Sequence, residues 1–194
     1  KQLISVDQET ILDAETLASQ IAIAKAIEKY DLSRIITFHN KIQNAKQFAE
    51  TFNRTSTLIK NMDPSINEIH CDHISGQMKS SERNQKLYAL EHLSKKETRI
   101  LSNARCLAEG VDVPNLSGIA FINPKQSQID IIQAVGRAIR KSKDKTKGTI
   151  LIPLYISENE SLDEAILMTS FNKVWQVIIA LKSQDNLLSY CIDE

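Results

Sequence analysis

The sequence has few of the residues that build metal sites, disulfide frameworks and membrane spans. Its three cysteines, Cys71, Cys106 and Cys191, lie far apart, and no Cys-x-x-Cys motif occurs. This spacing argues against a zinc site or a disulfide framework and favours reduced thiols in a cytoplasmic protein. No run of about 18 apolar residues occurs, so we expect no membrane-spanning helix. No signal-peptide pattern is present, and the start at Lys1 suggests a fragment of a longer chain.

The charges of the chain balance, so composition alone does not mark a nucleic-acid-binding protein. Lysine and arginine together number 24, as do aspartate and glutamate, and the formal net charge is zero. A global basic field is therefore absent, whereas a local basic patch stays open. A length of 194 residues, 42% of them apolar, is typical of one soluble domain with room for a sizeable core.

Short apolar runs alternate with amphipathic segments along almost the whole chain. Strands are expected over 34–39, 68–75, 98–103, 117–124 and 149–156. Helices are expected over 13–30, 40–61, 80–93, 126–141 and 161–183, with one or two helical turns over 104–110. This alternation predicts an α/β fold in three layers, with a parallel sheet and helices on both of its faces.

The same pattern suggests one domain and shows where to search for its function. We expect the domain over 1–160, with 1–12 as a linker from a preceding domain, and a helical extension of the same domain over 161–194. In open α/β sheets the loops after the carboxyl ends of the strands carry function. Here these are the loops after His39, Ser75, Ser102 and Ile122. The histidines lack metal spacing as a set, and His70 and His73 are interpreted as structural.

Two neighbouring segments contain the residues best suited to chemistry. The first, "SNARCLAEGVDVP" over 102–114, follows an expected strand and brings a glycine, an aspartate and a proline close together. The second, "QAVGRAIRK" over 133–141, lies on the next expected helix. Its arginines, Arg137 and Arg140, are three residues apart, so on a helix they share one face.

These two segments resemble motifs V and VI of superfamily 2 helicases and translocases. Segment 102–114 matches the family pattern of motif V, and the fixed positions of motif VI are matched by Gln133, Gly136, Arg137 and Arg140. Two earlier segments, 34–48 and 72–87, resemble motif IV and the family segment that follows it. The resemblance covers about residues 34 to 155 in family order and implies the second RecA-like domain of such a motor.

The resemblance implies a nucleotide site that is shared with another domain. Arg137 and Arg140 would stabilise the charge that builds on the transferring γ-phosphoryl group, which suits an always-ionised, bidentate guanidinium. Asp112 would hydrogen-bond the ribose, and Gly136 would let its helix approach a neighbouring backbone or a ligand closely. Gly110 and Gln133 complete the expected nucleotide-binding set.

A second implied surface would follow the backbone of a nucleic-acid strand. Ser102 and Asn103 have small polar side chains at an expected strand end that faces a helix N-terminus, which suits a phosphate group. The loop after His39, which starts with Asn40, and the turn at Gly76 are expected to make similar contacts without reading bases.

Several of these assignments have a plainer alternative. The two arginines would also suit a helix C-terminus, and Asp112 would suit a turn before Val-Pro. The motifs in family order favour the functional interpretation of these three residues. Ser102 is equally suited to be a helix cap, and Gln133 to hydrogen-bond across a domain interface. The basic segment 141–147 is interpreted as a solvated turn, with a nucleic-acid role left open.

Two motifs that a complete motor needs are missing. No Gly-x-x-x-x-Gly-Lys-[Ser/Thr] cradle occurs, and no acidic pair follows a hydrophobic strand. The "DEAI" over 163–166 lies in an expected helix and is a coincidence. We therefore expect that an N-terminal RecA-like ATPase domain of the same polypeptide mainly holds ATP with Mg²⁺. The isolated chain is expected to be inactive.

The main hypothesis is the C-terminal motor domain of an ATP-dependent DNA helicase or translocase. The two segments resemble restriction-enzyme-associated DEAD/DEAH-like translocases, so nuclease or methyltransferase regions are considered as companions. An RNA helicase of the DEAD/DEAH type is the first alternative. It is weakened because DEAD-box enzymes usually carry His-Arg where this chain has Gln133 and Ala134. A non-catalytic RecA-like interaction module is the second alternative.

Overall fold

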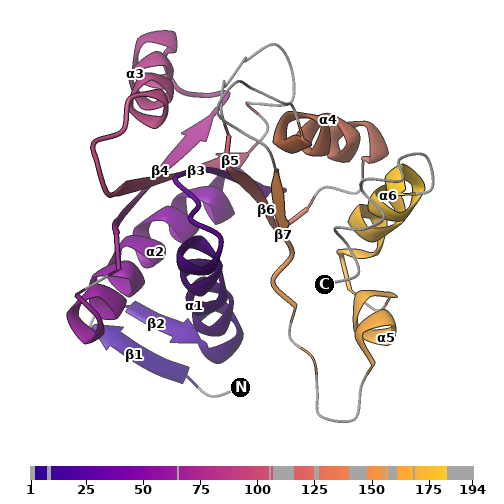
Figure 1. Cartoon of the computed structure of the whole chain (residues 1–194), viewed down its shortest axis with the longest axis horizontal. Helices are drawn as coiled ribbons and strands as arrows, with labels where there is room; N and C mark the ends of the chain where they lie inside the picture. Colours follow the sequence, from indigo (N-terminus) through magenta and orange to yellow (C-terminus); the bar gives the residue numbers. More distant parts are fainter. Residues whose placement is uncertain are drawn as a thin grey trace.

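Five parallel strands form the central sheet (Figure 1). In the order in which they lie side by side they are β4 (Glu68–Ser75), β5 (Glu97–Ala104), β3 (Arg34–His39), β6 (Gly118–Asn123) and β7 (Thr149–Leu151). All four pairings are parallel, so each needs a crossover, and helices supply it. The computed structural model describes residues 3–7, 10–64, 66–104, 106, 116–124, 127–139, 148–154, 156, 161–167 and 169–182.

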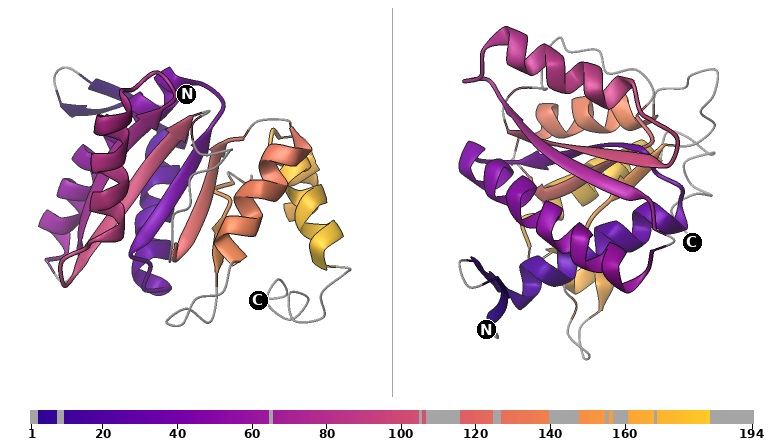
Figure 2. Two further views of the ribbon diagram at one scale, coloured as in Figure 1. Left: turned by 90° about the horizontal axis from the view of Figure 1, so that it is seen from above. Right: turned by 90° about the vertical axis from the view of Figure 1, so that its left-hand side faces the viewer.

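Helices cover both faces of this sheet. One face carries α1 (Ala14–Lys29) and α2 (Ile42–Met62). The other face carries α3 (Ser80–Glu91), α4 (Gln128–Ile139) and α6 (Asn172–Lys182). In the right-hand view of Figure 2 the sheet lies between α3 and α4 on one side and α1 and α2 on the other. The predicted three-layer α/β fold with a parallel sheet is therefore confirmed.

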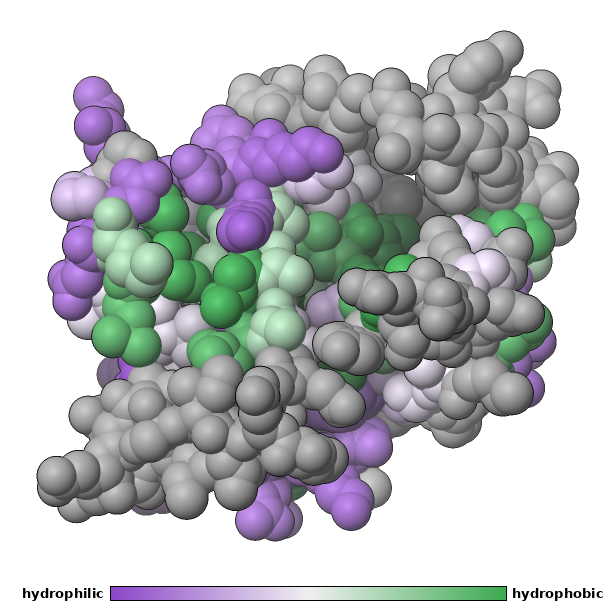
Figure 3. Space-filling view, turned by 90° about the horizontal axis from the view of Figure 1, so that it is seen from below, coloured by the Kyte–Doolittle hydropathy of each residue, from purple (hydrophilic) through white to green (hydrophobic). Residues whose placement is uncertain are grey.

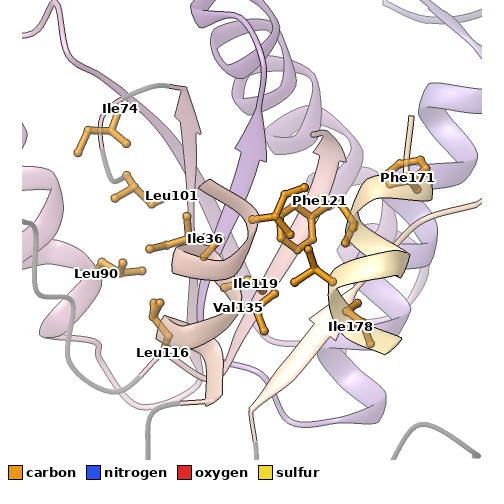
Figure 4. Close-up of a cluster of buried hydrophobic side chains, with 14 residues drawn as sticks. Ile36, Ile74, Leu90, Leu101, Leu116, Ile119, Phe121, Val135, Phe171 and Ile178 are labelled. Carbon is orange, nitrogen blue, oxygen red and sulfur yellow. The ribbon is translucent and has the colours of Figure 1, made fainter. Parts of the chain in front are cut away.

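Each strand supplies apolar residues to two separate clusters because its side chains alternate between the two faces. In β3, Ile35 packs toward α1 and α2, whereas its neighbour Ile36 packs toward α3, α4 and α6. Ile100 and Leu101 of β5 divide in the same way. Figure 4 shows the cluster that contains Ile36 and Leu101, in which side chains from the sheet and from the covering helices turn toward one another. The apolar runs that predicted the strands thus supply core side chains on both faces of the sheet.

The single closing helix predicted over 161–183 is wrong, because two helices take its place. These are α5 (Leu162–Leu167) and α6. Between them the Thr169 hydroxyl donates to the Ile166 carbonyl at 3.0 Å and accepts the Phe171 amide at 3.3 Å. A threonine that hydrogen-bonds nearby backbone groups competes with helical bonding, which accounts for the break.

The strand predicted over 149–156 is shorter than expected. β7 covers its first three residues, and Pro153, which has no amide hydrogen to give to a ladder, lies two residues beyond Leu151. Of the helical turns predicted over 104–110, the structure describes only Ala104, which ends β5, and Cys106. The remaining residues of that prediction lie outside the described part of the chain.

The segment predicted to be a linker contains a hairpin. β1 (Leu3–Asp7) and β2 (Thr10–Asp13) pair in antiparallel orientation ahead of α1. No strand was predicted from the sequence in this segment. The connection of this segment to a preceding domain stays a prediction, as do the domain limits at residues 160 and 161.

None of the described helices is long and apolar enough to cross a membrane. Within the described ranges, no group of three or more His, Cys, Asp or Glu residues is placed to hold a metal ion. Seen from below, hydrophobic residues reach the surface between hydrophilic ones (Figure 3). Scattered apolar side chains of this kind are common on soluble folds and define no site by themselves.

Candidate functional site

The carboxyl ends of four strands meet along one edge of the sheet. In the register, Ser75 of β4 lies opposite Ala104 of β5, and Ala104 lies opposite His39 of β3. His39 in turn lies opposite Asn123 of β6. The carboxyl edge of an open α/β sheet is where such folds bind their ligands. At or next to this edge lie the predicted nucleic-acid contacts His39, Asn40, Gly76, Ser102 and Asn103.

His39 lies at this edge, but its side chain faces inward. The residue is 3% exposed, and its ring packs against Phe48 of α2 with 5.0 Å between the ring centroids. Its Nε2 lies 3.1 Å from the Thr37 hydroxyl, and its Nδ1 lies 3.4 Å from Oδ1 of Asn123. Burial lowers the pKa of His39 to about 4, against the opposing effect of the hydrogen bond with Asn123. The imidazole is therefore neutral at physiological pH and presents no cation to a phosphate group.

Ser102 and Asn103 are buried as well, which corrects their expected geometry. β5 continues to Ala104, so Ser102 lies inside the strand, and its hydroxyl donates to the Ala45 carbonyl of α2 at 2.9 Å. Because Ser102 lies within β5 and not at the start of a described helix, it is not placed to cap a helix N-terminus. The side-chain Oδ1 of Asn103 accepts the backbone amide of Cys106 at 3.2 Å. A contact between the Ser102 hydroxyl and a phosphate requires that its bond to α2 be broken.

Exposed polar groups at this edge come from the starts of two helices. Lys41 is the N-cap residue of α2 and Lys79 that of α3, both are exposed, and neither helix has a side-chain cap hydrogen bond. Gly76 is exposed in the turn that leads to α3, which the Met78 amide closes by donating to the Ser75 carbonyl at 3.2 Å. Two lysines and two uncapped helix N-termini at one edge make it suitable for anions.

Asn40 is held by a local hydrogen bond at the same edge. Its Oδ1 accepts the side-chain amide of Asn44 at 3.0 Å, within the first turn of α2. The residue is half-buried, so part of its side chain faces solvent. Among the predicted nucleic-acid residues, Asn40 and Gly76 are therefore the ones that the structure leaves accessible.

Some of the residues predicted to bind the nucleotide lie on α4, and the others lie outside the described residues. One face of α4 is buried through Ile131, Ala134 and Val135. Gln133 and Gly136 therefore lie on its exposed face. A Cβ atom built on Gly136 would meet no described atom within 4 Å. The close approach predicted for Gly136 is thus not to a neighbouring backbone among the described residues.

The remaining predicted residues of the nucleotide site are not placed by the structure. Arg137 lies in α4, but its side chain is outside what the structure describes. Gly110, Asp112 and Arg140 lie outside the described residues altogether. Their roles as nucleotide ligands or catalytic arginines stay predictions.

Sequence reasoning missed several residues at the carboxyl edge. Asn123 and Thr37, the two hydrogen-bonding partners of His39, were not singled out, nor were Lys41 and Lys79. A signal existed for Asn123, because a polar residue stands there between an apolar strand and a proline. Thr37 gave no comparable signal, since a threonine within a strand is ordinary.

The interpretation of His70 and His73 as structural stays a prediction, because His70 is exposed and His73 is half-buried. His70 lies 3.3 Å from a carboxylate oxygen of Glu68 on the same strand. His73 is half-buried, and burial together with nearby Lys86 and Lys46 lowers its pKa. Both residues lie on β4, at the outer edge of the sheet.

The architecture and its polar carboxyl edge are those of the second RecA-like domain of helicases. Mss116p DEAD-box helicase domain 2, solved bound to an RNA duplex, shares the fold at 17% sequence identity. Its TM-score is 0.51 over 72% of this chain and 49% of that one. Residues 18–142 match the helicase conserved C-terminal domain family, and the chain belongs to that family. The resemblance to superfamily 2 inferred from the motifs is thereby confirmed.

Two relatives are more similar in sequence. The ATP-dependent Type ISP restriction-modification enzyme LlaBIII, solved bound to DNA, is 30% identical with a TM-score of 0.78. That match covers 96% of this chain and 13% of LlaBIII. Probable helicase A859L of African swine fever virus is 38% identical over 96 residues, which are 49% of this chain and 10% of the viral protein. The chain thus corresponds to a small part of each relative.

Proposed function

We propose that this chain is the C-terminal motor domain of an ATP-dependent superfamily 2 translocase or helicase that acts on DNA. The observation that carries the proposal is the exposed face of α4, on which Gln133 and Gly136 lie at the spacing of motif VI. Among the described residues, no atom would contact a Cβ built on Gly136, so this face is available to a ligand or a second domain. Membership of the helicase family and the likeness to LlaBIII over 96% of the chain support this assignment.

The nucleotide would be ATP with Mg²⁺, held mainly by a preceding RecA-like domain of the same polypeptide. Gln133 and Gly136 on α4, together with Gly110 and Asp112, would contact the nucleotide from this side. The absence of any described atom within 4 Å of a Cβ built on Gly136 is compatible with a ligand that approaches the helix closely. Arg137 and Arg140 would stabilise the negative charge that develops on the transferring phosphoryl group, and no base or nucleophile is required of this chain.

The nucleic acid would cross the carboxyl edge, where Lys41, Lys79 and two uncapped helix N-termini face solvent. These groups suit a phosphate backbone and carry no sequence information. Asn40 and Gly76 belong to the same surface. ATP-driven closure and opening against the partner domain would alternate the grip on the strand and produce stepping.

DNA is preferred over RNA because LlaBIII, the relative with the greater sequence identity and coverage, is a DNA enzyme by its name. The RNA alternative has support from the shared fold of the Mss116p domain, at lower identity. Comparing ATPase stimulation by DNA and RNA strands of the same sequence decides between them. A non-catalytic interaction module is the third candidate, and it predicts that no nucleic acid stimulates ATP hydrolysis.

The catalytic assignment is tested in the longer polypeptide that joins this domain to its ATP-binding partner. Arg137→Ala and Arg140→Ala are each expected to lower nucleic-acid-stimulated kcat by about 10³-fold or more, because they remove charge stabilisation in the transition state. Arg54→Ala, at an exposed position on α2, is the matched control and keeps the wild-type rate. Wild-type turnover in both arginine variants would exclude the arginine-finger role.

A further inference from the structure

β6 contains an irregularity at the point where it leaves the sheet. Its register with β3 runs without a break from Ile35 opposite Gly118 to Phe38 opposite Phe121, and then shifts so that His39 lies opposite Asn123. Ile122 is therefore an extra residue on β6, a β-bulge. Bulges redirect side chains and are frequent beside functional sites. Here the bulge brings Asn123, which an unbroken register would place one residue further on, directly against His39.

The bulge completes a short hydrogen-bonded chain of three side chains. The Thr37 hydroxyl lies 3.1 Å from Nε2 of His39, and Oδ1 of Asn123 lies 3.4 Å from Nδ1. A neutral imidazole satisfies both contacts at once, by accepting from Thr37 and donating to Asn123. Thr37 and His39 are buried, and Phe48 of α2 packs against the ring. The ring is thus contacted by three side chains, of which that of Asn123 belongs to an exposed residue.

This chain joins two parts of the domain that the proposed function uses for different ligands. On the β3 side, His39 is followed by Asn40 and Lys41, at the surface assigned to nucleic acid. On the β6 side, Asn123 is followed by Pro124 and then by α4, which carries the residues assigned to the nucleotide. The pair His39–Asn123 is therefore a direct side-chain link between the two surfaces.

We propose that His39 is a positioning residue that couples the two surfaces: through Asn123 it sets the start of α4 relative to the nucleic-acid loop. This inference rests on the proposed function. His39 itself touches neither ligand. When nucleic acid binds at the segment between β3 and α2, the link moves α4 into its active position. Without the link both ligands still bind, but binding of one no longer favours the productive arrangement of the other.

The link is tested with variants of Asn123 in the longer polypeptide, measuring basal and DNA-stimulated ATPase. Asn123→Ala removes the acceptor and is expected to lower the ratio of stimulated to basal kcat by about fivefold or more, with basal kcat and the KM for ATP unchanged. Asn123→Asp keeps an acceptor at the same position and is expected to retain the ratio. Asn123→Gln moves the acceptor outward by one methylene and is expected to behave like Asn123→Ala.

The matched control lies at the other end of the same two strands. The Ser117 hydroxyl, just before β6, accepts the Ser33 and Arg34 amides at the start of β3, both at 2.9 Å. Ser117→Ala weakens the β3–β6 contact without touching Asn123, so the stimulation ratio is expected to stay at its wild-type value.

Failure of the inference is distinguishable from failure of the proposed function. If wild-type protein shows no DNA-stimulated ATPase, the proposed function is wrong and the inference falls with it. If stimulation is present and Asn123→Ala retains it, only the link is refuted. Equal losses in Asn123→Asp and Asn123→Ala, or in Ser117→Ala, would reduce Asn123 to a structural role and overturn the link as well.

Discussion

The two ends of the same strands are built in different ways. At the amino edge, side chains bind backbone groups: the Ser117 hydroxyl accepts the Ser33 and Arg34 amides and donates to the Arg34 carbonyl at 3.0 Å. The Thr98 hydroxyl similarly donates to the Leu32 carbonyl at 3.2 Å. These bonds join the start of each strand to its neighbour and satisfy polar groups that would otherwise be left unpaired.

The carboxyl edge also contains side-chain-to-backbone bonds, at Ser102 and Asn103, but His39 bonds two other side chains and charged groups face solvent. The Nδ1 of His39 and the Oδ1 of Asn123 are 3.4 Å apart, and the lysines at two uncapped helix starts are exposed. We expect a pair of side chains to rearrange more easily than a bond that ties two strands together. The amino edge is therefore expected to be the more rigid of the two, and the carboxyl edge, where parallel sheets bind ligands, the more adjustable.

The largest effect expected to distinguish the two edges is a pH dependence of the free energy of unfolding, which arises from His39 at the carboxyl edge. The pKa of folded His39 is about 4, below its ordinary value of 6.5, so between these pH values the unfolded chain binds a proton that the folded chain does not. Stability therefore falls as pH is lowered from about 6.5 to about 4, by about 3 kcal/mol in total. Urea unfolding of the 194-residue chain across this range measures it.

The control for this titration is His39→Gln, which removes the ionisable group and is expected to flatten the pH dependence. A smaller fall remains, because the pKa of His73 is also lowered in the folded chain and acts in the same direction. An unchanged slope in His39→Gln would show that His39 is not the residue that titrates, and that the carboxyl edge is not the acid-sensitive part of the sheet.

A smaller effect on the free energy of unfolding is expected from Ser117→Ala, which removes hydrogen bonds at the amino edge. The substitution leaves the amides of Ser33 and Arg34 without their acceptor and is expected to lower the free energy of unfolding by about 2 kcal/mol. Asn40→Ala at the carboxyl edge removes one exposed bond to Asn44 and is expected to change it by less than about 0.5 kcal/mol. Urea midpoints measured at pH 7 compare the two, and equal losses would contradict a stability difference between the edges.

The sequence predicted the layers of the fold better than the details of the carboxyl edge. The limits of β3 and β4 were predicted as the structure has them: β3 is a short apolar run buried in the middle of the sheet, and the first half of β4 alternates between exposed polar and buried apolar residues. The bulge at Ile122 left no pattern, since it depends on how β6 pairs with β3. The inward-facing hydroxyl of Ser102 was missed for a similar reason, because its acceptor, Ala45, is 57 residues away along the chain.

The motif residues were found from the sequence, but their spatial relations were not. Gln133 and Gly136 stand at fixed spacing in a family pattern, which a linear reading detects. The exposed side of α4 follows from which of its residues the sheet and α6 bury, and that is a tertiary property. The break between α5 and α6 likewise depends on the hydrogen bonds chosen by Thr169, which helical periodicity does not report.

The smallest expected effect concerns the salt dependence of nucleic-acid binding at the two edges. Lys41 at the carboxyl edge and Lys95, in the turn before β5 at the amino edge, are both exposed lysines. If Lys41 contacts a phosphate, Lys41→Gln reduces the slope of log K against log salt by about 0.7 on single-stranded DNA, because one fewer counterion is released. Lys95→Gln is expected to leave the slope unchanged. Fluorescence anisotropy titrations at several salt concentrations measure both, and equal slopes in the two variants would mean that the strand does not cross the carboxyl edge at α2.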